Sequence, residues 1–161
     1  MSHSRIFELS REPFKEISFT PDDIPEWFFY SISDGAEEQT PDERKESIKW
    51  LFEYAGTLFD TDGDSFIFKK NGNVEYFKPL YSSFKKVFEE MKLPSLEEFS
   101  RMEKDFFDFD LNFFKLSEAL HHKYEFYFYV DDWLMPMPEF VRNFFKEGDR
   151  YYIGGVVDYH C

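Results

Sequence analysis

The most regular pattern of apolar positions along the chain runs from Leu96 to His121. Its apolar residues recur at spacings of three and four, the period of one helical face: Phe99, Met102, Phe106, Phe109, Phe113, Leu116 and Leu120. Ser95 and Glu98 match a capping box, which marks a helix start. We therefore predict a helix here, and we expect the protein core to pack against its apolar face.

A second pattern overlaps this segment and leaves an alternative open. Apolar and polar residues alternate from Phe107 to Phe113, which is the period of a strand. The pattern is therefore compatible either with one continuous helix or with a helix that breaks near Asp108–Asp110.

Shorter patterns predict the other elements. Thr40, Pro41 and Glu43 combine an N-cap, a proline at the first helical position and a capping-box acid, so a helix is expected to start there. Further helices are expected at Pro79–Met91 and around Phe140–Phe145. Alternating apolar residues predict strands at Arg5–Leu9, Phe14–Phe19, Ser65–Lys70, Val74–Phe77, Tyr124–Val130, Tyr151–Ile153 and Val156–Tyr159.

Turn signals suggest how these strands connect. Asn71-Gly72-Asn73 predicts a β-hairpin, and Gly154-Gly155 is typical of either a tight hairpin or a β-bulge. Asp131–Pro138 is expected to be a loop, and Met1–Ser4 a flexible tail. The mixture of strands and helices predicts one α+β domain over residues 1–161, with a largely antiparallel sheet and three to four helices packed on one face.

The charge distribution indicates which classes of partner the protein can bind. The chain carries a net charge of −14, and residues 20–64 contain 13 acidic and three basic side chains, a net −10. Nucleic acids and anionic membranes are also negative, so direct binding to either is disfavoured. We expect instead a protein partner with a basic surface.

Aromatic residues supply candidate contacts for such a partner. Aromatics make up 22% of the chain, including 23 Phe. Two groups are candidates for a contact surface, since Trp, Tyr and Met are enriched in interface cores: Trp27–Tyr30, and Trp133 with Met135 and Met137. The alternative is that they belong to the hydrophobic core. The candidate partner-binding residues are Asp22, Asp23, Glu26, Trp27, Phe28, Glu37, Glu38, Trp133 and Met135.

One segment resembles a known ion-binding loop. Asp60, Asp62 and Asp64 occupy the first, third and fifth positions of a loop that resembles the start of an EF-hand calcium loop. Ser65 and Asn71 replace the glycine and the bidentate glutamate of that loop. We therefore expect an acidic turn leading into a hairpin, and no tight calcium site.

Signals for catalysis are absent from the sequence. The chain contains no phosphate-binding glycine loop, no H-E-x-x-H, no G-x-S-x-G and no paired C-x-x-C. His121 and His122 are adjacent and diverge by about 100° on a helix, and His160 and Cys161 lie at a chain end, where fraying is expected. We therefore expect no catalytic residue, no metal and no cofactor.

These observations favour an acidic protein-binding module. The expected role is an inhibitor or immunity-type protein that docks on a basic partner surface; in one version it acts as a DNA mimic, a resemblance of composition only. The alternative is a carboxylate- or metal-dependent hydrolase of unknown substrate that uses scattered carboxylates and His160. No apolar run resembles a signal peptide or a membrane span, so a cytoplasmic location is expected.

Overall fold

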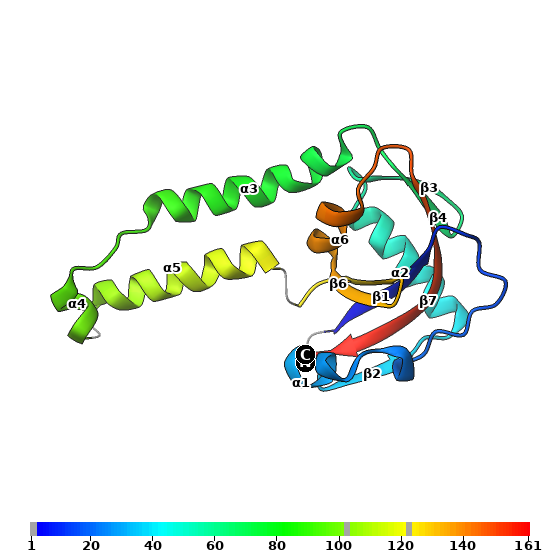
Figure 1. Ribbon diagram of the computed structural model, residues 1–161, viewed down its shortest axis with the longest axis horizontal. Coiled ribbons are helices and arrows are strands. Elements are labelled where there is room, and N and C mark those ends of the chain that lie inside the picture. Colours follow the sequence, from blue (N-terminus) through cyan, green and yellow to red (C-terminus); the bar gives the residue numbers. More distant parts are fainter. Residues whose placement is uncertain (1–2, 102–103, 122–123) are drawn as a thin grey trace. The chain divides into compact units, whose positions relative to one another are not determined.

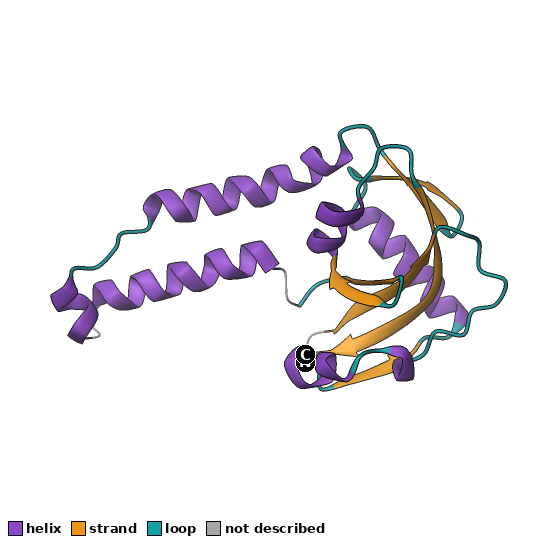
Figure 2. Ribbon diagram, in the orientation of Figure 1, coloured by secondary structure: helices purple, strands orange, loops and turns teal. Residues whose placement is uncertain are grey.

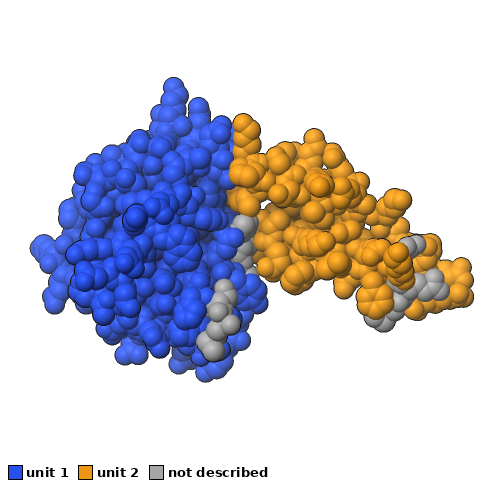
Figure 3. Space-filling view, turned by 180° about the vertical axis from the view of Figure 1, so that it is seen from behind, with its two compact units in different colours: residues 1–76, 123–161 blue, residues 77–122 orange. Residues whose placement is uncertain are grey.

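The protein is described by a computed structural model that covers residues 3–101, 104–121 and 124–161 (Figure 1). The chain divides into two compact units, one made of residues 1–76 with 123–161 and the other of residues 77–122 (Figure 3). We call them the sheet unit and the helical unit. Within the described residues, no helix combines the length and the hydropathy that crossing a membrane requires.

The sheet unit is built on one seven-stranded sheet (Figure 2). Its strands are β1 (His3–Ser10), β2 (Gly35–Glu38), β3 (Phe59–Asp62), β4 (Ser65–Phe68), β5 (Tyr127–Val130), β6 (Trp133–Pro136) and β7 (Arg150–His160). The spatial order is β3-β4-β7-β1-β5-β6, and β2 pairs with β7. Only β1 and β5 pair in parallel among the described strands; the other pairs are antiparallel.

Helices cover both faces of this sheet. The sheet unit contains η1 (Pro21–Asp23), α1 (Glu26–Ser31), α2 (Pro41–Tyr54) and α6 (Met137–Phe144). Phe128 on one face packs against Phe140 of α6, and Arg5 on that face bonds Ser47 of α2. On the other face, Phe28 of α1 packs in a buried cluster with Ile6, Phe19, Ile24, Tyr127, Leu134, Val157 and Tyr159.

The predicted α+β class and largely antiparallel sheet are confirmed. The described residues contain six α-helices, more than the three to four expected, and α1 lies on the opposite face of the sheet from α2 and α6. The remaining helices are α3 (Gly72–Glu90), α4 (Leu96–Arg101) and α5 (Lys104–His121). Most of α3, together with α4 and α5, forms the helical unit.

The segment with the strongest helical pattern is helical but is not the core. It forms α4 and α5 with no break near Asp108–Asp110, while Met102 lies outside the described residues. On the predicted core face, Leu116 is buried and Phe106 and Phe109 are half-buried, but Phe99 and Phe113 are 54% and 59% exposed. The prediction that the core packs against this whole face was wrong, because helical periodicity shows which side chains can be buried together and not what covers them.

Several predicted strands and loops differ in the structure. Val74–Phe77 belongs to α3, which starts at Gly72, so no hairpin forms at Asn71. A Cβ at Gly72 would lie 2.9 Å from the Leu58 carbonyl oxygen, which explains why this position is glycine. Phe14–Phe19 forms no strand, His3 and Ser4 belong to β1 rather than to a tail, and the expected loop at 131–138 contains β6 and the start of α6.

The acidic segment after α2 forms the β3–β4 hairpin. Gly63 occupies the turn with a positive φ of 59°, a conformation that glycine adopts without strain. The carboxylates pair with basic side chains of the sheet unit: Asp60 with Lys69, Asp62 with Arg150 and Asp64 with Arg44. The acidic segment is therefore a hairpin turn in its own right, whereas the hairpin that it was expected to lead into, with its turn at Asn71-Gly72-Asn73, does not form.

Gly154-Gly155 forms a β-bulge inside the continuous strand β7. The β1–β7 register shifts there, since Phe7 pairs with Val156 but Leu9 pairs with Ile153. The Gly155 N–H donates to Oε2 of Glu8 at 2.9 Å. Arg44 of α2 donates to the Ile153 and Gly154 carbonyls, both at 2.7 Å. These bonds satisfy backbone groups where β7 lies between its pairings with β4 and β2.

Glu8 makes stability depend on pH. Burial raises the pKa of Glu8 above its ordinary value of 4.5, and the Asp23 carboxylate acts in the same direction, while the bond from Gly155 opposes both. The folded chain thus binds the proton of the Glu8 carboxyl group more tightly than the unfolded chain does. The contribution of Glu8 to stability is therefore greatest below pH 4.5 and is lost as pH rises.

We therefore expect Glu8→Gln, which keeps an oxygen acceptor for Gly155, to gain stability relative to wild type as pH rises from 4 to 7. Urea unfolding followed by tryptophan fluorescence measures this difference. Glu12→Gln, at an exposed carboxylate just beyond β1, is the matched control. An equal difference between Glu8→Gln and wild type at both pH values would contradict the assignment.

Candidate functional site

A groove on the sheet unit brings the two predicted aromatic groups together. It has a volume of about 510 Å³ and is lined by Pro25, Trp27, Tyr127, Asp132, Trp133, Leu134, Pro136 and Glu139. Trp27 belongs to α1 and Trp133 to β6, far apart in the sequence. We call this feature the tryptophan groove.

Packing of α1 on the sheet positions Trp27. Phe28 is fully buried and its ring meets Tyr127 and Tyr159 edge to face, with centroid distances of 4.9 and 5.1 Å. Successive residues on a helix point about 100° apart, so burying Phe28 turns Trp27 toward the surface. Trp27 is consequently 47% exposed, while the buried Phe28 holds α1 on the sheet.

The β5–β6 turn positions Trp133. Asp131 and Asp132 have φ angles of 50° and 63°, and Val130 pairs directly with Trp133, so the turn has two residues. Two successive positive φ angles are typical of a tight hairpin turn, and Asp tolerates this region better than most residues. Trp133 follows at once as the first residue of β6 and is 68% exposed.

The floor of the groove is buried and its rim is acidic. Tyr127 and Leu134 are buried, whereas Asp132 and Glu139 are exposed carboxylates. The described residues that line the groove include no Lys, Arg or His. The groove therefore combines aromatic surface with two exposed carboxylates.

The carboxylates also act on the nearby phenols. Burial raises the pKa of Tyr129, and Asp132 and Asp23 act in the same direction. The Tyr129 hydroxyl lies 3.3 Å from Oδ1 of Asp132 and donates to it. Burial likewise raises the pKa of Tyr127, with Glu139 adding to the effect. Both phenols therefore stay protonated at neutral pH, so the negative charge of this region comes from its carboxylates.

The structure brings some of the predicted contact residues together and removes others from the surface. Trp27 and Trp133 face the same groove, and Glu26 is exposed next to Trp27. Phe28 and Met135 are 0% and 6% exposed, so they support the fold and do not touch a partner from the folded surface.

The other predicted acids do not converge on the groove lining. Asp22 and Asp23 lie on η1, where Asp23 accepts the Thr20 N–H at 2.8 Å and so caps the turn. Glu37 and Glu38 are exposed neighbours on β2, and successive strand residues point to opposite faces of a sheet. Asp132 and Glu139 lie outside residues 20–64 and were not among the predicted contact residues, because no local pattern places them beside Trp27.

Histidines gather elsewhere on the sheet. His3 and His160 are direct partners in the β1–β7 ladder, and Asp158 lies two residues before His160. Sequence alone places His3 in a tail and His160 at a frayed end, whereas strand pairing holds both. His121 ends α5, and His122 lies outside the described residues.

Comparisons with known proteins identify no relative of this chain. Models of protein families, curated proteins and solved structures were all searched, and none of them matches the chain.

Proposed function

We propose that the protein is an acidic protein-binding module whose tryptophan groove holds a basic segment of a partner protein. One observation carries the proposal: two exposed tryptophans, Trp27 and Trp133, line one groove together with the carboxylates of Asp132 and Glu139.

The chemistry of the groove fits a cationic side chain. Indole faces attract Lys and Arg cations, and the attraction grows as water is excluded. Carboxylates at the rim add charge-assisted hydrogen bonds, which Arg makes in bidentate fashion. Arg also stacks on aromatic rings and is more weakly hydrated than Lys, so the groove favours Arg. A volume of about 510 Å³ lies within the range typical of ligand sites, roughly 300–1,000 Å³.

The net charge of −14 supports the same partner class. Excess negative charge speeds encounter with a basic surface and repels acidic competitors. An inhibitor or immunity-type role is the wider form of this proposal. The DNA-mimic version receives less support, because Glu37 and Glu38 point to opposite faces of the sheet and the groove offers indole rings where a phosphate mimic would present charge.

The expected result is that the groove binds arginine-rich peptides. We expect blocked hexapeptides of arginine to bind more tightly than those of lysine and hexapeptides of glutamine not to bind, as measured by calorimetry at 50 and 300 mM salt. Binding should weaken at the higher salt, where the Debye length shortens. Trp133→Ala should lower the affinity for the arginine peptide by at least about tenfold, as expected for an interface hot spot.

Matched variants distinguish the contribution of the groove to peptide affinity from that of the overall negative charge. Tyr30→Ala removes an aromatic side chain of α1 that is 85% exposed and does not line the groove, and it should leave affinity unchanged. Asp132→Asn with Glu139→Gln should weaken binding more than Asp42→Asn with Glu46→Gln, which neutralises two exposed acids of α2. Equal losses in both double variants, or full affinity in Trp133→Ala, would contradict the proposal.

A further inference from the structure

Three side chains with metal-ligating atoms meet where β1 begins and β7 ends. His3, Asp158 and His160 each offer one ligand atom, and these atoms all lie within 4.8 Å of one another. The antiparallel register places His3 opposite His160 and Arg5 opposite Asp158. Residues two apart on a strand share a face, so the ladder itself gathers the three side chains on one face of the sheet. The tryptophan groove uses none of them.

We propose that His3, Asp158 and His160 form a binding site for a divalent transition-metal ion, with Zn²⁺ as the best fit. Two imidazoles and one carboxylate are donors that suit Zn²⁺. Three protein ligands leave a fourth tetrahedral position for water or a small ligand, which is the ligand count of catalytic rather than structural zinc sites.

The distances fit this ion. A tetrahedral ion with bonds of about 2.0–2.1 Å holds neighbouring ligand atoms about 3.3 Å apart. Nδ1 of His3 lies 3.3 Å from both carboxylate oxygens of Asp158. The ring of His160 lies beside that of His3, with centroids 4.3 Å apart. The three ligand atoms lie within 4.8 Å of one another. The proposal therefore requires the His160 side chain to rotate so that its ring nitrogen reaches the ion.

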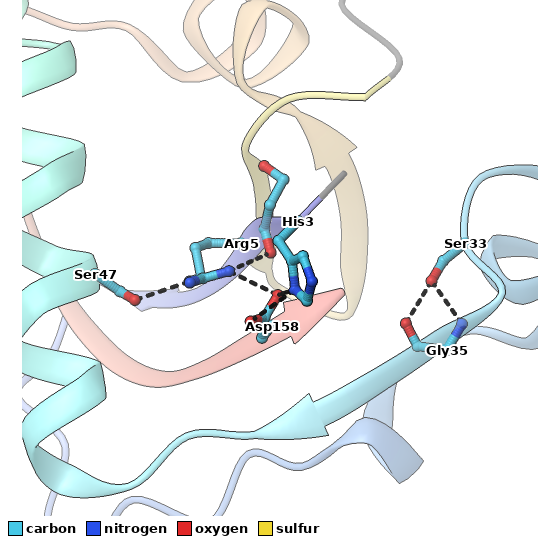
Figure 4. Close-up of polar contacts among 7 residues, drawn as sticks. His3, Arg5, Ser33, Gly35, Ser47 and Asp158 are labelled. Atoms are coloured by element: carbon cyan, nitrogen blue, oxygen red, sulfur yellow. Dashed lines mark hydrogen bonds and ion pairs between the residues drawn. The ribbon is translucent and has the colours of Figure 1, made fainter. Parts of the chain in front are cut away.

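Neighbouring groups hold the carboxylate in place (Figure 4). Nη1 of Arg5 lies 2.6 Å from Oδ1 of Asp158, and its Nε donates to Ser47 Oγ of α2 at 2.9 Å. The guanidinium also lies over the Trp50 ring, 5.5 Å from its centroid. Arg5 thus orients Asp158 through one oxygen and leaves Oδ2 for the ion, as hydrogen-bonded partners do around ligating carboxylates.

Charge and access also favour a cation at this position. Glu37 of β2 pairs with Asp158 in register and is exposed, so a second carboxylate points to the same face of the sheet. The side chain of His3 is 49% exposed, which leaves the ion an entry path. His3 also lines a cavity of about 210 Å³ with Ser4, Trp50, Tyr54, Tyr124, Glu125 and Phe126. That cavity has room for a water or a small anion next to the ligand.

The test uses Zn²⁺ alone on the protein without a histidine tag. We expect calorimetry to give one site per chain with micromolar or tighter affinity, and Co²⁺ to bind at the same site with the visible absorption of tetrahedral coordination. His3→Ala, His160→Gln and Asp158→Asn should each lower the affinity for Zn²⁺ by at least about tenfold. His121→Ala, at an exposed histidine of α5, should leave it unchanged.

Two further controls test whether Cys161 is a ligand and whether the His3 variant is folded. Cys161→Ser should leave Zn²⁺ affinity unchanged, because the proposal uses no thiolate. His3 is half exposed at the start of its strand, so its variant is expected to stay folded, and far-UV circular dichroism checks this. Three results would overturn the proposal: no stoichiometric binding by the wild type, loss of binding in Cys161→Ser, or full affinity in either histidine variant.

Discussion

Replacing Phe128 with alanine is expected to lower the free energy of unfolding of the sheet unit by about 3–5 kcal/mol. Phe128 is fully buried on β5, which lies between β1 and β6. Its ring packs against Phe140 of α6 and Phe7 of β1, with centroid distances of 4.7 and 6.0 Å. Because these neighbours belong to different elements, we expect the site to collapse only partly around the missing ring and a cavity to remain. Urea unfolding followed by tryptophan fluorescence measures the loss, since Trp27, Trp50 and Trp133 all belong to the sheet unit.

Phe113→Ala is the matched control for this prediction. Phe113 lies on α5 and is 59% exposed, although its place in the helical pattern resembles that of a core residue. Substitutions at such surface positions change stability by about 0.5 kcal/mol or less. A loss for Phe113→Ala as large as that for Phe128→Ala would show that the helical unit carries the core after all.

Gly155→Ala is expected to destabilise the protein by roughly 1–3 kcal/mol, because one added methyl group overpacks the bulge in β7. A Cβ at this position would lie 2.5 Å from Cβ of Phe19 and 3.1 Å from its carbonyl oxygen. Phe19 cannot easily retreat, since it is itself buried and its ring packs against Tyr129 with centroids 5.0 Å apart. The same fluorescence-detected urea unfolding measures the effect.

Gly35→Ala provides the comparison at a glycine with open space. Gly35 pairs with His160 near the other end of β7, and a Cβ there would meet no atom within 4 Å. We therefore expect it to be tolerated, even slightly stabilising through reduced freedom of the unfolded chain. If both glycine variants unfold at the same urea concentration as wild type, close packing of Phe19 on the bulge does not constrain the fold.

The tryptophan groove was predictable only in part from the sequence. Trp27 and Trp133 were candidate contact residues by type, since indole is common in interface cores. Nothing in the sequence shows that α1 packs on β5 and so brings these two side chains to one groove. Phe28 and Met135 carry the same composition signal but are buried, because exposure depends on which face of an element the sheet covers.

The sequence by itself determined those features that depend on residues close together in the chain. Thr40 and Glu43 cap α2 as predicted, since each bonds the backbone N–H of the other, at distances of 2.8 and 3.4 Å. Alternation along Arg5–Leu9 correctly indicated β1, because period two follows from strand geometry alone. The α+β class and the acidic charge likewise follow from local patterns and composition.

Only the tertiary structure decided which apolar faces are covered and which distant residues meet. Asn71-Gly72 has the residues of a hairpin turn, yet Gly72 starts α3 where it contacts the backbone of Leu58. His3 and His160 become neighbours because β1 and β7 pair along their length. Such contacts depend on strand order and on packing between elements far apart in the chain. Local propensity does not encode them, since the free energy that selects them arises only when the whole sheet forms.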